Sequence, residues 1–177
     1  MKLKLIKLTE KYKDALCEMI DEWREDQIKN NTDRSPGVIF KNDPRDFDYY
    51  VDHLDLKVET GRYVPGSAFF LLDEERDRLL GAVHIRHYLN EELRHSGGHI
   101  GDGIRPTERG RGYGNEIVRL ALEECRKLGI DRVLMTCDKD NVASAKTIIK
   151  NGGVLEDEFV NLHGVIEQRY WIDLTRG

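Results

Sequence analysis

The sequence predicts a mixed α/β domain whose central sheet of six to seven strands is flanked by about four helices. Apolar runs between turn residues predict the strands, and apolar residues spaced three and four apart predict the helices. Strands and helices are interspersed along the chain, which is typical of α/β architectures. A length of 177 residues suits one domain, and no repeat or linker divides residues 1–177.

The N-terminal segment is expected to form a strand followed by a long helix. Charged and apolar residues alternate over about 3–8, as they do in a half-buried strand. Residues 30–43 carry turn-forming residues, so we expect a mobile connection after the helix. The helix itself is expected over about 10–29, with one apolar face made of Tyr12, Leu16, Met19, Ile20 and Trp23.

A second helix and a hairpin are expected next. Asp43-Pro44 is a good helix start, because a capping aspartate precedes proline at the first helical position, and Gly61 would end the helix. Two apolar runs, at about 66–73 and 79–89, flank a charged turn. A pair of this kind predicts two antiparallel strands.

The second half of the chain alternates strands and helices before it ends in a hairpin. Gly129 would stop the longer of the two helices, and Asp140-Asn141 would cap the shorter one. The expected elements are a strand at about 98–106, a helix at 115–128, a strand at 132–137, a helix at 141–150 and strands at 154–162 and 165–174.

The turn before the longer helix reads Arg109-Gly110-Arg111-Gly112-Tyr113-Gly114. A glycine-rich turn between a strand and a helix presents unpaired backbone N–H groups at the positive end of that helix. Such a turn binds phosphate without a metal ion or a side-chain base. The spacing differs from the ATP-binding loop and from the dinucleotide-binding fingerprint, which both require other glycine positions.

Arg109-x-x-Gly112-x-Gly114 resembles the phosphate-loop signature of the GCN5-related N-acetyltransferases. The resemblance begins at Ile104 and continues through the strand at 132–137 and the helix that Asn141 caps. It implies a sheet that splays between its fourth and fifth strands, with a cofactor core at about 98–153. It also implies that acetyl-coenzyme A is the acetyl donor.

The same resemblance assigns residues to the cofactor. A backbone N–H near Gly103 or Ile104 would stabilise the oxyanion that forms on the thioester. Asn141 is either a helix cap alone or also a partner of the pantetheine arm, and Ser144 is a weaker candidate for that arm. The pyrophosphate would be held by the amides of Arg109, Gly110, Arg111, Gly112, Tyr113, Gly114 and Asn115.

Acetyl transfer needs a deprotonated amine, so we searched the sequence for a base. His99 and Asp102 are candidates on opposite faces of one strand, because their positions differ by three, which is an odd number. The alternatives are a solvated edge residue for His99 and a salt bridge for Asp102.

A general acid is harder to assign. The resemblance places a tyrosine seven residues after Asn141, where this chain has Ile148. Tyr170 on the last strand is a substitute candidate for protonating the thiolate, and its alternative is a core or rim aromatic.

A metal site is not predicted. His84, His87, His95 and His99 lie close in sequence, but their spacing does not align them, and no cysteine or carboxylate completes a ligand set. Three cysteines without metal or disulfide spacing suit a reducing compartment, so we expect a cytoplasmic protein.

Charge and hydropathy exclude other classes. The net charge of −5 argues against nucleic acid as the main partner and weakly favours a cationic acceptor. No apolar run approaches the roughly 20 residues that cross a bilayer. A monomer and a homodimer are both compatible with the sequence.

Three functions follow, in decreasing order of preference. The first is acetylation of a small-molecule amine by acetyl-coenzyme A. The second is acetylation of a protein or peptide N-terminus, because Pro106 to Gly114 also resembles enzymes that acetylate ribosomal proteins. The third is a sensor that binds acyl-coenzyme A without turnover, since the usual tyrosine is absent.

Overall fold

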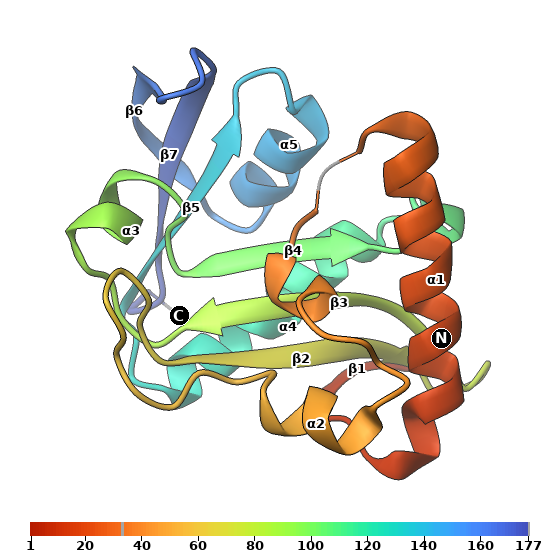
Figure 1. Ribbon diagram of the computed structural model, residues 1–177. Helices are drawn as coiled ribbons and strands as arrows, with labels where there is room; N and C mark the ends of the chain where they lie inside the picture. The colour runs from red at the N-terminus through yellow and green to blue at the C-terminus, as the bar shows by residue number, and fades with distance from the viewer. Residues whose placement is uncertain (33, 177) are drawn as a thin grey trace.

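The computed structural model describes residues 1–32 and 34–176. Seven strands form two antiparallel sheets rather than one continuous mixed sheet. The first sheet has the order β1-β2-β3-β4, and the second has the order β5-β7-β6 (Figure 1). The strands are β1 (Leu3–Ile6), β2 (Gly66–Asp73), β3 (Arg78–Arg86), β4 (Ile100–Ile104), β5 (Arg132–Asp138), β6 (Val154–Val160) and β7 (Ile166–Asp173).

Helices cover both faces of the first sheet. In Figure 1, α1 and α2 lie in front of this sheet and α4 lies behind it. The α-helices are α1 (Lys13–Asn30), α2 (Phe47–Asp52), α3 (Glu91–His95), α4 (Tyr113–Lys127) and α5 (Val142–Lys150). Short 3₁₀ helices are η1 (Glu10–Tyr12), η2 (Gly37–Phe40) and η3 (Pro106–Glu108).

The core is divided into two layers by the first sheet. Successive residues of a strand point to opposite faces, so Phe70 of β2 packs toward α1 and α2, whereas Leu71 packs toward α4. Trp23 of α1 is 1% exposed in the first layer. Full burial of a large apolar side chain stabilises the fold by about 1.5–3 kcal/mol.

Helix α4 packs against both sheets. Its buried face belongs to the same cluster as Val83 of β3, Val133 of β5 and Ile172 of β7. The buried residues of α4 itself are Tyr113, Ile117, Val118, Ala121, Leu122 and Cys125. Packing on α4 therefore connects the two sheets.

The sheets meet at the start of β4. One isolated antiparallel bridge links Gly98 to Met135. The backbone N–H of His99 donates to the Leu134 carbonyl oxygen at 2.8 Å. Beyond this point β4 belongs to the first sheet and β5 to the second. The predicted splay between the fourth and fifth strands is confirmed.

Most predicted elements are present within a few residues of their expected bounds, but the second helix was predicted wrongly. Residues 43–61 contain only α2, which begins at Phe47 and ends at Asp52. The Asp43 side chain accepts a hydrogen bond from the Arg45 N–H at 3.0 Å, which is a local turn and not a helix start. Val58, which the predicted helix would have included, lies outside α2 and is 65% exposed.

Two further differences concern short segments. The connection expected to be mobile contains η2, where Ile39 is fully buried, although residue 33 of that connection lies outside the described residues. Helix α3 was not predicted, because five residues are too few to show a period. Asn90 caps α3 by accepting from the Leu93 N–H at 2.9 Å.

Candidate functional site

The loop between η3 and α4 contains two glycines in the left-handed region. Gly110 has a φ of 75° and Gly112 has a φ of 86°. A Cβ atom at either position would meet nothing within 4 Å. Backbone conformation, and not crowding, therefore explains the glycines, and the space above them is open.

Helix α4 begins directly at this loop. Gly112 is its N-cap, and the first N–H groups of the helix have no acceptor within the helix. The helix dipole makes this end positive. Open space, free donors and a positive helix end are the features that a phosphate group requires.

The two arginines of the loop have different positions. The Arg109 side chain turns away from the loop, since its Nε donates to the Ile104 carbonyl oxygen at 3.0 Å and its guanidinium reaches Asp26 at 3.1 Å. Arg111 is 58% exposed and lies 3.5 Å from Glu108. Arg111 is therefore the loop side chain that is available to an incoming anion.

Helix α5 lies beside the loop. The Asn151 side-chain amide donates to the Asn115 side-chain oxygen at 3.0 Å and so joins the end of α5 to the start of α4. A Cβ atom at Gly114 would lie 4.0 Å from the Thr147 hydroxyl. Asn115 is thus held by a protein partner at the edge of the loop.

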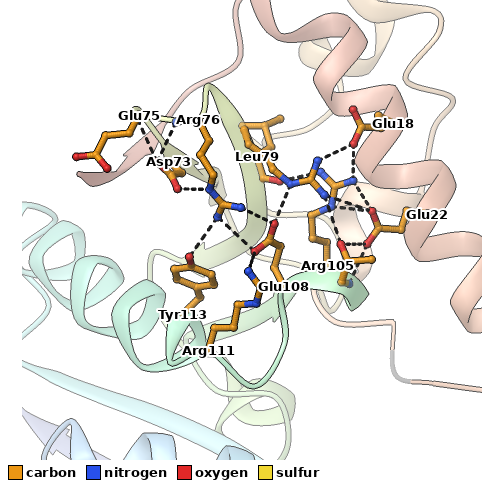
Figure 2. Close-up of polar contacts among 12 residues, drawn as sticks. Glu18, Glu22, Asp73, Glu75, Arg76, Leu79, Arg105, Glu108, Arg111 and Tyr113 are labelled. Carbon is orange, nitrogen blue, oxygen red and sulfur yellow. Dashed lines mark hydrogen bonds and ion pairs between the residues drawn. The ribbon is translucent and has the colours of Figure 1, made fainter. Parts of the chain in front are cut away.

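Buried charges lie behind the loop (Figure 2). Glu108 is 3% exposed and accepts hydrogen bonds from Arg76 at 2.9 Å and Arg78 at 2.8 Å. Burial alone would raise the pKa of Glu108, but the two arginines outweigh that effect and lower the pKa. The carboxylate therefore stays ionised, as a buried and paired charge must.

A second ionic cluster ties α1 to η3. Arg105 is 1% exposed and donates to Glu18 at 2.8 Å, to Glu22 and to the Leu79 carbonyl oxygen at 3.0 Å. The other oxygen of Glu22 accepts from the N–H of Thr107 at 3.0 Å and from its hydroxyl at 2.8 Å. Helix α1 thereby holds the turn that leads into the loop.

Sequence reasoning missed these ionic partners. Glu18, Glu22 and Asp26 are spaced by four residues, which places them on one face of α1. That spacing was the one available signal, but an acidic stripe on a helix is usually a solvated face. Their arginine partners are about 80 residues away in the sequence.

His99 occupies a structural position at the junction of the sheets. It is 6% exposed, and its Nδ1 accepts a hydrogen bond from the Leu134 N–H at 2.9 Å. Burial lowers the pKa of His99 to about 4, with a further contribution from the charge of Arg86. The expectation of a solvated edge residue is wrong, and the geometry favours a structural role over that of a base.

Asp102 lies in the middle of β4. It is half-buried and stands opposite Val83 of β3. Strand alternation places it on the face of Ile100 and Ile104, which α4 covers. Gly101 and Gly103 lie on the other face, where Ser35 and Trp23 pack.

β4 is the last strand of its sheet, so one row of its backbone groups faces the gap to β5. Gly103 and Ile104 are the last residues of this strand before the chain turns toward the loop. The N–H of Arg105 donates to the Leu80 carbonyl oxygen of β3, so strand alternation turns the N–H of Gly103 toward β3 and that of Ile104 toward the gap. Of the two, Ile104 is therefore the residue compatible with the predicted oxyanion donor.

Three polar side chains lie on the second-sheet side of the gap. The Tyr170 hydroxyl donates to Gln168 at 2.8 Å, and burial raises the pKa of Tyr170, with Cys137 and Glu158 adding to the shift. Burial also raises the pKa of Cys137, against a hydrogen bond from the Ser144 side chain. Tyr170, Cys137 and Ser144 therefore lie near the end of β5.

Asn141 caps α5 as predicted. Its side chain accepts a hydrogen bond from the Ser144 N–H at 3.1 Å, and the residue is exposed. Ile148 is 1% exposed and belongs to the core that α4 covers. The position at which the resemblance places a tyrosine therefore serves packing in this chain.

The described residues give no metal site. Among residues 1–32 and 34–176, no group of three or more histidine, cysteine or carboxylate side chains could hold an ion. Within the same part of the chain, no helix is both long and apolar enough to cross a membrane.

Known structures share this fold. An acetyltransferase of the GNAT family from Bacillus anthracis is 18% identical, with 99% of this chain and 97% of that chain covered and a TM-score of 0.65. A chimera of the spermidine N-acetyltransferase SpeG from Vibrio cholerae and hSSAT is 15% identical over 99% and 98% of the chains, with a TM-score of 0.64.

A third similar structure was solved with a ligand. RimL, a ribosomal L7/L12 α-N-protein acetyltransferase in complex with coenzyme A, is 14% identical over 98% and 96% of the chains, with a TM-score of 0.65. At these identities the likeness concerns the fold. A comparison with curated protein sequences gives no significant match.

A family model provides the assignment. The acetyltransferase (GNAT) domain model matches residues 2–154, which is most of the chain and includes the glycine-rich loop. The expected family, the fold and the acetyl donor are thereby confirmed. The chain belongs to the GNAT family and is an N-acetyltransferase that uses acetyl-coenzyme A.

Proposed function

We propose that this enzyme transfers the acetyl group of acetyl-coenzyme A to the amine of a small molecule. The glycine-rich loop at the start of α4 is the observation that carries the proposal. In this proposal the amides of residues 109–115 bind the pyrophosphate, and Arg111 adds a positive charge. The pantetheine arm follows the gap between β4 and β5, past Asn141 and Ser144.

The chemistry needs few side chains. The N–H of Ile104 stabilises the oxyanion as the amine attacks the thioester carbonyl. Asp102 is the candidate that takes the proton from the amine, through water because its side chain lies on the face of β4 opposite to the glycines. Tyr170 is the candidate acid for the thiolate, because a tyrosine hydroxyl carries a proton at neutral pH that it can donate.

A small acceptor is favoured by the cover over β4. The ideal Cβ position of Gly103 meets the Ser35 carbonyl oxygen and lies 2.7 Å from the Trp23 ring. The segment around Ser35 and Pro36 therefore packs directly on the glycine face of β4. This packing covers the glycines of β4 and disfavours an extended peptide along that face.

A cationic acceptor is favoured by charge. The chain has a net charge of −5, and a similar fold is that of a spermidine N-acetyltransferase. We therefore place a polyamine first among acceptors to test. A peptide with a free N-terminus is second, because RimL has a similar fold.

The cofactor is tested by calorimetric titration with acetyl-coenzyme A, desulfo-coenzyme A and ATP. Binding of the two coenzyme A ligands without binding of ATP would support the phosphate-loop assignment. Binding of ATP with the same affinity, or no binding of coenzyme A ligands, would overturn it.

The acceptor is tested by the release of free coenzyme A thiol in the presence of spermidine, a simple monoamine and a peptide with an N-terminal serine. Turnover with spermidine or the monoamine supports the proposal. Turnover with the peptide alone would establish the second function. Tight binding of acetyl-coenzyme A with no thiol release from any amine would favour the sensor.

A further inference from the structure

Arg76 lies outside the glycine-rich loop, in the turn between β2 and β3, yet it contacts residues on both sides of that loop. Its guanidinium donates to Glu108 at 2.9 Å and to the Tyr113 hydroxyl at 3.1 Å. Glu108 is the last residue of η3, and Tyr113 is the first residue of α4. Figure 2 shows this one side chain spanning the base of the loop.

The contacts of Arg76 are well sheltered from water. Glu108 is 3% exposed, Tyr113 is 5% exposed and Asp73 is 2% exposed. Polar groups at such positions depend on protein partners, since water reaches them poorly. A planar guanidinium can serve several partners at fixed angles, which an ammonium group cannot do.

The turn that carries Arg76 is itself fixed. Asp73 accepts from the Arg76 Nε at 2.6 Å, and it also accepts from the N–H groups of Glu75 at 3.0 Å and Arg76 at 3.2 Å. The hydrogen bonds to Glu108 and Asp73 raise the pKa of Arg76 above its ordinary value, and Glu108 is the larger contributor. Arg76 is thus a permanently charged and well-oriented group.

The loop needs contacts that fix its ends, because its glycine backbone can adopt many conformations. Gly110 and Gly112 have few conformational restrictions of their own, and a Cβ atom at either position would meet nothing within 4 Å. Four residues, 109–112, separate the two ends that Arg76 holds. Fixing those ends limits the directions in which the loop N–H groups can point.

We infer that Arg76 is a positioning residue for the phosphate loop and acts through Glu108 and Tyr113. The inference rests on the proposed binding of coenzyme A phosphates by this loop. Arg76 does not touch the phosphate; it prepares the loop before the cofactor arrives. Arg78 also contacts Glu108, at 2.8 Å, and Arg111 lies 3.5 Å from it, so Glu108 keeps two ion pairs when Arg76 is replaced.

The test is calorimetric titration of the full chain and its variants with coenzyme A. Arg76→Met should weaken binding about tenfold, since the preorganisation of the loop is lost. Arg76→Lys keeps the charge but cannot span Glu108 and Tyr113 together, so it should weaken binding about threefold. If charge alone mattered, the lysine variant would bind like the wild type, and the inference would be wrong.

Arg45→Met is the matched control. Arg45 also pairs with two carboxylates, Asp21 of α1 at 2.6 Å and Asp43 at 3.5 Å, but both partners are exposed, at 52% and 62%. The control loses the same charge and should change affinity by less than about twofold, as exposed ion pairs contribute little. Equal losses in Arg76→Met and Arg45→Met would also overturn the inference.

A double variant keeps the test valid if Arg76→Met folds poorly. Arg76→Met combined with Glu108→Gln removes the buried charge together with its partner, a change that is milder for the fold. Its loss of affinity should equal that of Arg76→Met, because both act through one chain of contacts. A loss in the double variant that is larger than the loss in Arg76→Met would mean that Arg76 and Glu108 act independently, and it would overturn the inference. Failure of the wild type to bind coenzyme A would instead refute the proposed function.

Discussion

The two ends of β4 differ in what their residues do. At its start, the chain joins the second sheet through the Gly98–Met135 bridge and the two hydrogen bonds between His99 and Leu134. At its end, β4 parts from β5 and leads through Arg105 and η3 into the glycine-rich loop. The first end is closed and the second is open.

At the closed end, a side chain that could act as an acid or a base has a structural role instead. The sequence made the His99 imidazole a candidate base, but in the structure its Nδ1 accepts a hydrogen bond from the backbone N–H of Leu134. In the loop beyond the open end, a Cβ atom at Gly110 or Gly112 would meet nothing within 4 Å, so the backbone there can be approached by a ligand. A residue type therefore predicts function only together with its place relative to the gap.

The closed end should respond most to acid. His99 has a folded pKa of about 4 against about 6.5 in the unfolded chain, so only the unfolded chain takes up a proton between these values. The stabilisation is present above pH 6.5 and is lost as the pH falls toward 4. We expect the free energy of unfolding to fall by about 3 kcal/mol from this group, measured by urea unfolding.

His99→Gln tests the source of that slope. Glutamine can still accept from the Leu134 N–H, but it does not titrate. Burial lowers the pKa of His84 to about 4 as well, so the variant should lose roughly half of the pH dependence. Glu22 and Glu108 have lowered pKa values, so the stability that these ionised carboxylates contribute is lost only at still lower pH. An unchanged slope in His99→Gln would contradict this account.

The open end should be sensitive to a single methyl group at Gly103. An added Cβ would collide with the Ser35 carbonyl oxygen and lie 2.7 Å from the Trp23 ring. We expect Gly103→Ala to lower the free energy of unfolding by about 1–3 kcal/mol, as overpacking does. Gly101→Ala is the control, because its nearest neighbour is the Ser35 hydroxyl at 3.5 Å. Equal stability of the two variants would show that the segment does not cover β4.

Gly112→Asp should act on binding and not on packing. Gly112 has a φ of 86°, and a Cβ atom there meets nothing within 4 Å. Strain in the left-handed region and the added negative charge should weaken coenzyme A binding by at least about tenfold, measured by calorimetry. Gly112→Ala separates the strain from the charge.

Gly164→Asp is the control for Gly112→Asp. Gly164 has a φ of 75° and open space around it, but it lies in the turn between β6 and β7. It should bind coenzyme A like the wild type. A dissociation constant that stays the same in Gly112→Asp would refute the phosphate-loop assignment.

The smallest effect is expected at Tyr170. Tyr170→Phe removes the hydroxyl that donates to Gln168 and leaves the ring in the core. Because a thiolate is a tolerable leaving group near neutral pH, we expect kcat at saturating acetyl-coenzyme A to fall only about threefold. Tyr88→Phe, at an exposed tyrosine, serves as the control. If kcat is the same in Tyr170→Phe and the wild type, Tyr170 is not the acid.

Local patterns predicted what local forces decide. The glycine-rich loop, the Asn141 cap and the face of α1 with Leu16, Met19, Ile20 and Trp23 buried all follow from residues a few positions apart. The helix expected from Asp43 failed because the Asp43 side chain closes a turn with the Arg45 N–H instead. Capping residues also form turns, and only the surrounding packing decides between the two outcomes.

Long-range pairs could not be predicted in the same way. Arg76 meets Glu108 across 32 positions, and Arg105 meets Glu22 across 83. In the sequence these are ordinary charged residues, and no periodicity connects them. The burial of His99 is equally non-local, since it depends on β5 reaching the start of β4.

The single bridge between the sheets has a consequence for how the protein would respond to its cofactor. Among the described residues, β4 and β5 are joined by that bridge and form no hydrogen-bonded ladder beyond it. A molecule lying in the gap would act as a missing strand and would bind the folded chain only. At a concentration of 100 times its dissociation constant, it would add about 2.7 kcal/mol of stability and slow amide hydrogen exchange along both edges.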